Sequence, residues 1–427
     1  MRPPIYLVYE DEGYKNFLPL TYFRPSFELI TGTKTLQERI EELYPKSPSY
    51  LLCRDYLVET LSERIHRGFG GKGKKPLAKF NQVPPQTGQP LILINGRAIL
   101  HKRLPTTTTD TVFRNAEEIV ALFLATEKLK EKFSKGITYP LSFRFLGEIA
   151  KETETKEVKI DVIRYLWDLV NQNANLLIQD LGRPQKNSGW IDKRVVVYGK
   201  SSKIFVDRGA RVEAGVVLDT KEGPISIGKN SLVRGPSIID GPCYIGENTL
   251  IDGAKIRGGT TIGNYCRIAG EIEESIIMSY TNKHHDGFLG HAYLGEWINI
   301  GALTTNSDLK NDYGEVKVFL PSGEINTRSL KVGCFIGDHT KTAIGTLINT
   351  GTIIGVVSNV FGGGVVKKFL PSFSWGDSEK FVEHKLDNAL KTAKTVMSRR
   401  NVSMNQAYEG LFRIVFEIAK IEEKLKI

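Results

Sequence analysis

A small apolar residue followed by glycine recurs through residues 204–366 at multiples of about six positions. One coil of three such periods separates successive pairs. Ile245-Gly246 follows Ile227-Gly228 by 18 positions, and Ile262-Gly263 follows Ile245-Gly246 by 17. A six-residue period matches neither one face of a helix nor the alternation of a flat sheet, and it is the mark of a parallel β-helix. The sequence therefore predicts a three-sided prism, with three short strands in each coil around one apolar axis.

The residues before the repeats read as an α/β domain with a Rossmann-like parallel sheet. Two short apolar runs, Ile5–Tyr9 and Leu91–Ile94, are typical of buried parallel strands. Helical patterns are predicted at 35–44, 55–66 and 115–133, the first with Thr35 and Glu38 in capping-box spacing.

Breaks in the patterning predict three domains. A Gly/Pro/Asn-rich connection precedes the repeats, so residues 1–190 form the first domain and 191–372 the β-helix. Residues 373–427 are predicted to be a helical cap, with one helix over 379–400 and a second that is opened by Ser403.

The composition limits the class of protein and its partners. Charged residues make up 25% of the chain and no apolar run has the length of a membrane span, so we expect a soluble cytoplasmic protein without a membrane partner. The four cysteines lack paired spacing and are predicted to be reduced. The formal net charge of +10, without interleaved aromatic residues, favours small phosphorylated ligands over nucleic acid.

The stretch Leu18-Pro19-Leu20-Thr21-Tyr22-Phe23-Arg24-Pro25 resembles the "PLT…RP" segment of sugar-1-phosphate nucleotidyltransferases. The resemblance implies contacts to nucleotide and sugar phosphate by Arg24, Asn95 and Arg97, and the use of Mg²⁺, for which no ligand is assigned. Two departures stand out. The acidic turn Glu10–Glu12 replaces a glycine-rich phosphate loop, and Asn95 stands where the superfamily usually has a magnesium-binding aspartate.

A polar segment interrupts the repeats between Ile272 and Asn299 and contains the adjacent His284 and His285, followed by Asp286. Loops that leave a rigid scaffold often carry the chemistry. An imidazole can accept a proton from an amine that attacks a thioester, and a neighbouring carboxylate can orient it.

Residues 283–306, KHHDGFLGHAYLGEWINIGALTTN, resemble the acetyltransferase half of the bifunctional UDP-N-acetylglucosamine diphosphorylase/glucosamine-1-phosphate N-acetyltransferase family. The resemblance implies that His285 is the catalytic base and that His284 and His291 are structural or peripheral. Acetyl-CoA or acceptor contacts would come from six positions, with Phe288 in place of the family's tyrosine: Phe288, Asn299, Gly301, Ala302, Asn306 and Lys310. The basic residue that holds the acceptor phosphate stays open among Arg257, Arg267 and Lys283.

The same resemblance implies a left-handed β-helix, a homotrimer, and coenzyme A bound between neighbouring prisms. It implies two reactions: acetyl transfer from acetyl-CoA to glucosamine 1-phosphate, and transfer of a nucleotidyl group from UTP or dTTP to the sugar 1-phosphate. Two alternatives remain: only one half is active, or the chain is a non-catalytic regulatory trimer that binds sugar nucleotides.

Overall fold

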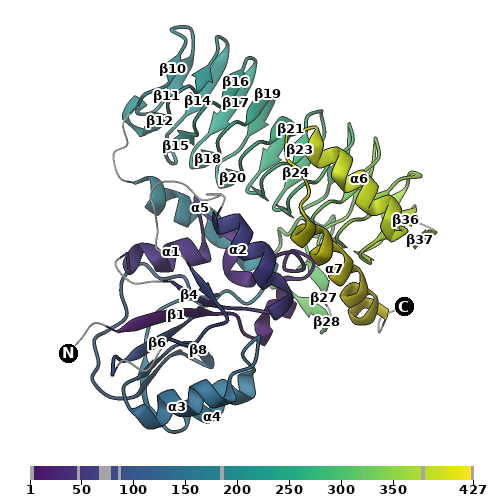
Figure 1. Cartoon of the computed structure of the whole chain (residues 1–427). Helices are drawn as coiled ribbons and strands as arrows, with labels where there is room; N and C mark the ends of the chain where they lie inside the picture. Colours follow the sequence, from purple (N-terminus) through teal and green to yellow (C-terminus); the bar gives the residue numbers. More distant parts are fainter. Residues whose placement is uncertain are drawn as a thin grey trace. The chain divides into compact units, whose positions relative to one another are not determined.

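The computed structural model describes residues 4–45, 49–66, 78–84, 88–182, 187–320, 322–376 and 380–424. The chain divides into two compact units, one built mainly from residues 1–164 and the other mainly from Tyr165 onward (Figure 1). Helix α5 (Leu166–Leu181) belongs to the second unit. The domain limits predicted from the sequence place this helix in the first domain, and they stay a prediction.

The first unit is built on a seven-stranded sheet with the order β5-β4-β1-β6-β8-β7-β9. Strand β1 runs parallel to β4 and β6, as the apolar runs predict, whereas β8 is antiparallel to β6 and β7. The strands are β1 (Ile5–Tyr9), β4 (Tyr50–Leu52), β5 (Lys79–Phe80), β6 (Leu91–Asn95), β7 (Thr111–Asn115), β8 (Glu118–Leu124) and β9 (Glu154–Glu157). The helices are α1 (Leu36–Leu43), α2 (Val58–His66), α3 (Glu127–Gly136) and α4 (Phe143–Ala150).

One predicted helix is partly wrong and one is confirmed to its cap. Residues 115–133 contain the end of β7, strand β8 and only the first part of α3, because Ala116 (φ 50°) turns the chain into a hairpin. The capping box of α1 is present: the Thr35 hydroxyl accepts from the Glu38 amide, and the Glu38 carboxylate accepts from the Thr35 amide.

The second unit is a parallel β-helix with three faces, which confirms the predicted fold (Figure 1). Strands in successive coils pair in register, as Ile225 with Cys243 and Ile227 with Ile245. Inward side chains from all three faces form one apolar core, in which residues such as Val233, Ile239 and Ile245 are fully buried. Stability therefore sums over neighbouring coils.

Each face is defined by its strands. The first face holds β10 (Trp190–Ile191), β13 (Arg211–Val212), β16 (Leu232–Arg234), β23 (Asn282–Lys283), β30 (Lys341–Thr342), β33 (Asn359–Val360) and β36 (Ser374–Gly376). The second holds β11 (Val196–Tyr198), β14 (Val216–Asp219), β17 (Ser237–Asp240), β24 (Phe288–Gly290), β26 (Thr305–Asn306), β31 (Leu347–Ile348) and β34 (Val365–Val366). Strands β19 (Leu250–Ile256) and β21 (Arg267–Glu273) run over both of these faces.

The third face is one nine-stranded sheet. It holds β12 (Ile204–Val206), β15 (Ile225–Ile227), β18 (Cys243–Ile245), β20 (Thr260–Ile262), β22 (Ile276–Ile277), β25 (Tyr293–Leu294), β29 (Phe335–Ile336), β32 (Ile353–Ile354) and β35 (Phe369–Leu370). The break in the repeat that follows Asn306 contains an antiparallel hairpin, β27 (Lys317–Leu320) and β28 (Gly323–Asn326).

Two helices, α6 (Leu386–Ser398) and α7 (Gln406–Lys424), follow the last coils, after β37 (Phe381–Glu383). A stacked aromatic column on one corner, with Tyr280 and Trp297 rings 4.0 Å apart, leads to His339, whose Nε2 lies 2.9 Å from the Tyr408 hydroxyl of α7. Asn405 rather than the predicted Ser403 caps α7, since its side-chain oxygen accepts from the Tyr408 amide.

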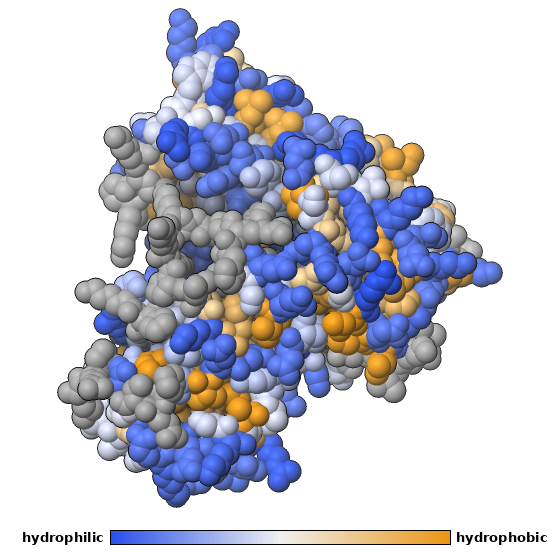
Figure 2. Space-filling view, in the orientation of Figure 1, coloured by the Kyte–Doolittle hydropathy of each residue, from blue (hydrophilic) through white to orange (hydrophobic). Residues whose placement is uncertain are grey.

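The cysteines are free and buried, as predicted. No helix among the described residues is long and apolar enough to cross a membrane. On the face shown in Figure 2, hydrophilic residues separate several smaller hydrophobic patches.

Candidate functional site

The corner of the β-helix between its second and third faces holds a histidine between two carboxylates. The Nδ1 atom of His291 lies 2.8 Å from an Asp308 carboxylate oxygen, and its Nε2 atom lies 3.3 Å from a Glu274 oxygen. The side chain of His291 is only 7% exposed. We call Glu273, Glu274, His291, Asp308 and Lys331 the corner site.

The coiling of the chain brings these residues together. Glu274, His291 and Asp308 occupy equivalent positions in successive coils, since the sequence interval from Glu274 to His291 equals that from His291 to Asp308. The amide of His291 donates to the Glu273 carbonyl, and the amide of Gly333 donates to the His291 carbonyl. His291 has a φ of 48°, a left-handed conformation that other corner residues of the coils share, such as Glu274 (φ 41°) and Trp297 (φ 61°).

The two carboxylates stabilise the charged form of the imidazole. Burial opposes this, but the hydrogen bonds to Asp308 and Glu274 outweigh it and raise the pKa of His291 to about 9. The pKa of Glu274 is lowered, chiefly by its hydrogen bond to His291. Asp308 fixes Nδ1, so Nε2, facing the half-exposed Glu274, is the atom able to exchange a proton with a ligand.

Two of the predicted contact residues, Asn306 and Phe288, lie beside the corner site. The Asn306 side chain accepts from the Gly290 amide and donates to the Gly290 carbonyl, so it holds the residue before His291. A Cβ atom at Gly290 would lie 2.5 Å from the Phe288 ring and 2.6 Å from the Asp308 carboxylate, so a side chain there would displace one of them. Lys331 pairs with Glu273 at 2.9 Å.

The predicted base His285 lies at the other end of strand β24. Its side chain is exposed, and its ring stands 5.8 Å from that of His284. Within the described part of the chain, no hydrogen bond or ion pair reaches the His285 ring; Asp286 does not hold it. The structure therefore separates His285 from the carboxylate-bound His291, and the catalytic role of His285 stays a prediction.

The remaining predicted acetyl-CoA and acceptor residues are dispersed. Asn299 lies on the first face, where its side chain accepts from Asn282, and Lys310 pairs with Asp312 on the surface. The Gly301 amide donates to the Thr342 hydroxyl. The Ala302 carbonyl accepts from the amide of Gly345 in the next coil.

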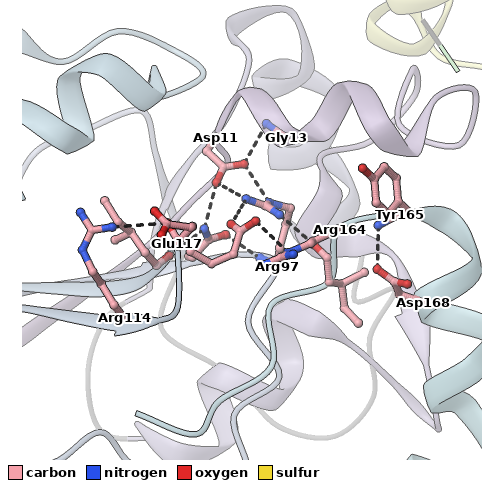
Figure 3. A network of polar contacts seen from close by, with 12 residues as sticks. Asp11, Gly13, Arg97, Arg114, Glu117, Arg164, Tyr165 and Asp168 are labelled. Atoms are coloured by element: carbon pink, nitrogen blue, oxygen red, sulfur yellow. Dashed lines mark hydrogen bonds and ion pairs between the residues drawn. The ribbon is translucent and has the colours of Figure 1, made fainter. Parts of the chain in front are cut away.

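The first unit has a second cluster of charged groups at the ends of strands β1 and β6 (Figure 3). Arg97 grips both oxygens of Asp11, at 2.9 and 2.7 Å, and also contacts Glu118 at 3.2 Å. The Asn95 amide group donates to Asp11, and its oxygen accepts from the Arg97 amide. Asp11, Asn95 and Arg97 are each at most 2% exposed.

The neighbouring acid is paired in the same way. Glu10 is fully buried and is held by Arg54 at 2.9 Å through Nε and at 3.2 Å through an amino group. Arg54 also donates to the Arg24 carbonyl, and the Arg24 side chain is itself 1% exposed. Glu10 and Asp11 of the acidic turn are thus neutralised by internal arginines, and Arg24 and Arg97 are buried rather than open to a phosphate.

These residues do not fit a divalent cation as they stand. Mg²⁺ prefers carboxylate oxygens with several waters around it. Both oxygens of Asp11 are engaged by a guanidinium group, Glu118 is shared by Arg97 and Arg164, and the Asn95 oxygen accepts a backbone hydrogen bond.

Sequence reasoning did not identify Glu274, His291 and Asp308 as a cluster. The pattern H-x-x-aromatic-L-G fits residues 285–290, whereas His291-Ala292-Tyr293-Leu294-Gly295-Glu296 fits it with one residue fewer. Acidic residues one coil before and one coil after His291 were the signal that could have distinguished the two histidines.

Comparisons with known proteins agree with this architecture. Residues 6–188 match the family described as sugar nucleotidyl transferase. The chain is 31% identical over 209 residues to a bifunctional sugar-1-phosphate nucleotidylyltransferase/acetyltransferase of Sulfurisphaera tokodaii, covering 47% of this chain and 45% of the relative. It is 30% identical over 179 residues to the uncharacterized acetyltransferase YaiX of Escherichia coli, covering 41% of this chain and 78% of the relative.

A third relative is the bifunctional protein GlmU of Synechococcus elongatus, 29% identical over 160 residues, with 34% of this chain and 31% of the relative covered. The chain thus spans less than half the length of two of these three relatives. A parallel-sheet domain followed by a parallel β-helix of hexapeptide repeats defines the class of two-domain protein to which this chain is similar. The chain belongs to the same family as the acetyltransferase YaiX, and its residues 6–188 are similar to sugar nucleotidyl transferases.

Proposed function

We propose that the chain is a transferase of amino-sugar nucleotide synthesis. Its β-helix acetylates an amino-sugar 1-phosphate such as glucosamine 1-phosphate from acetyl-CoA, and its first domain transfers a nucleotidyl group from UTP or dTTP to the sugar 1-phosphate. The observation that carries the acetyl transfer is the imidazole of His291, which is buried between two carboxylates at a corner of the β-helix.

In the acetyl transfer, the substrate amine attacks the thioester carbonyl carbon and the coenzyme A thiolate leaves. The attacking amine loses one proton, which the Nε2 atom of a neutral His291 accepts while Asp308 holds the proton on Nδ1. The glutamate beside Nε2 stabilises the imidazolium that forms. His285, the base predicted from the sequence, is the rival for this role.

A second candidate is an acetyltransferase whose first domain transfers no nucleotide. The specific observation in its favour is that Arg24 and Arg97 are buried and that Arg97 is spent on Asp11. Under this candidate the first domain binds a sugar nucleotide or serves only in assembly, and Mg²⁺ has no part in it.

The proposal includes a homotrimer, cytoplasmic localisation, and small-molecule substrates as the only partners. Large apolar side chains lie exposed near the corner between the first and second faces, with Ile344 79% exposed; the others are Leu303, Leu347 and Val365. Exposed apolar groups that gather in one region favour burial against another subunit. Light scattering of the purified chain tests the trimer.

The test of the whole proposal is a mass-spectrometric product screen. The full chain is incubated with glucosamine 1-phosphate, acetyl-CoA and either UTP or dTTP, and each half reaction is scored separately. N-acetylated sugar phosphate together with sugar nucleotide supports the bifunctional enzyme, and the acetylated product alone supports the second candidate. If neither product forms, both enzymatic readings are wrong.

A further inference from the structure

Lys283 occupies a core position of the β-helix. In-register pairs along the first face place it in one inward column with four aliphatic residues: Val212, Val233, Ile251 and Ile268. Its side chain is 1% exposed. Burying an ammonium group costs free energy that an aliphatic residue would avoid, so a lysine here needs a reason other than packing.

Two carbonyl groups hold the lysine. The Nζ atom donates to the carbonyl of Ala269 at 2.9 Å and to the carbonyl of His285 at 3.0 Å. A Cβ atom at Gly270 would stand 2.7 Å from Nζ, so glycine makes room for the amine. No ion pair to this amine occurs within the described residues, and burial lowers the pKa of Lys283 to about 8. This lysine is therefore too deep to hold the acceptor phosphate.

The carbonyl of His285 belongs to the segment His284–Gly287, which we call the histidine loop. Two further polar contacts hold the loop. The Leu303 amide donates to the Asp286 carbonyl, and the His284 ring lies 3.3 Å from the Asp252 carboxylate. The side chains of His285 and Asp286 remain exposed. The loop leads directly into β24, which ends beside His291.

We propose that Lys283 is a positioning residue: its buried amine fixes the histidine loop, and through it the start of β24, whose other end lies beside His291. This rests on the proposed acetyl transfer. Burying the amine lowers the stability of the fold. What the chain gains from this lysine is a fixed loop, not a better-packed core.

The variant Lys283→Met tests this, because methionine fills the same space with an apolar side chain. Hydrogen exchange on the full chain without substrate should show amides 284–287 exchanging about tenfold faster or more, the effect of losing a hydrogen bond from a charged donor. The melting temperature should stay the same or rise. The kcat of acetyl transfer should fall by about tenfold, with little change in either KM, because β24 leads from the loop to His291.

Lys255→Met, which removes an exposed lysine from the second face, is the matched control and should change none of these quantities. Unchanged exchange in the loop of Lys283→Met would overturn the proposal. So would a failure to fold or faster exchange in every coil, since either result would make Lys283 a core residue. If the wild-type chain transfers no acetyl group, the proposed function fails, and loop exchange alone still decides whether Lys283 anchors the loop.

Discussion

The two clusters of charged residues in this chain differ in how completely their charges are paired. At the ends of β1 and β6, Asp11 and Glu10 are buried, and each is held by an arginine through both oxygens. At the corner site, His291 is buried but one of its partners, Glu274, is exposed. A closed network stabilises one arrangement, whereas a corner that is open on one side can exchange a proton with a ligand.

The difference shows that the end of a sheet, where an active site usually lies, can instead become part of the buried core. Strand ends of a parallel sheet usually bind ligands, and the family's phosphate loop would lie there. Here the acidic turn and the arginines satisfy one another. The β-helix, whose faces are regular, instead concentrates charge where the corner residues of successive coils meet.

The largest effect that tests this comparison is expected from Asp11→Ala, on the free energy of unfolding. Removing the acid leaves the Arg97 guanidinium buried without its main partner, which costs about 3–5 kcal/mol. Urea unfolding, monitored by hydrogen exchange of the amides in β1 and β6, measures the loss of free energy of unfolding. The amides of the β-helix should be unaffected. Glu42→Ala, which removes the partner of the exposed Lys34, is the control and should cost less than about 1 kcal/mol. Equal losses in the two variants would contradict a closed network.

A smaller effect is expected from Glu274→Gln on the pH dependence of acetyl transfer. In the wild type the pKa of His291 is about 9, so the rate should rise with pH toward that value as the base loses its proton. Without the Glu274 charge this pKa falls, and the profile should move to lower pH by about one unit. Glu247→Gln, an exposed carboxylate elsewhere on the β-helix, should leave the profile in place.

The same shift has a consequence for stability. Because the pKa of His291 is raised on folding, its charge stabilises the fold fully below about pH 6.5, and this contribution is lost as the pH rises through about 9. The difference in free energy of unfolding between wild type and His291→Gln should therefore shrink over that window. A difference that is constant with pH would rule out the raised pKa.

The smallest effect concerns helix caps in the two units. Thr35→Ala in α1 and Asn405→Ala in α7 should each cost about 1 kcal/mol, because each removes an acceptor for a first-turn amide. Ser403→Ala should have no effect. Exchange of the first-turn amides measures each loss, and a cost at Ser403 equal to that at Asn405 would contradict the observed cap.

The sequence predicted the β-helix well because its repeat is a local, periodic signal: Ile227 and Ile245 lie one coil apart and pair in register. The helix expected at 115–133 was partly wrong because the run Ile119–Leu124 is apolar at every position, and such a run fits a buried strand as well as a helix. The turn at Ala116 then made it a hairpin strand.

The residues that meet in each charged cluster were harder to predict than the fold. A linear pattern directed attention to His285, while the partners of His291 lie one coil before it and one coil after it and meet only when the chain coils. Likewise, nothing local indicates that Glu10 and Asp11 would be neutralised by Arg54 and Arg97, which lie 44 and 86 residues further along the chain.

The most direct measurement of the central claim is the rate of acetyl transfer from acetyl-CoA to glucosamine 1-phosphate by His291→Ala and His285→Ala, compared with the wild type. If the base is the imidazole between Asp308 and Glu274, His291→Ala should lose about 100-fold or more in kcat with its fold intact, and His285→Ala should retain most of the activity. Full activity in His291→Ala, with the loss falling on His285→Ala, would contradict the account.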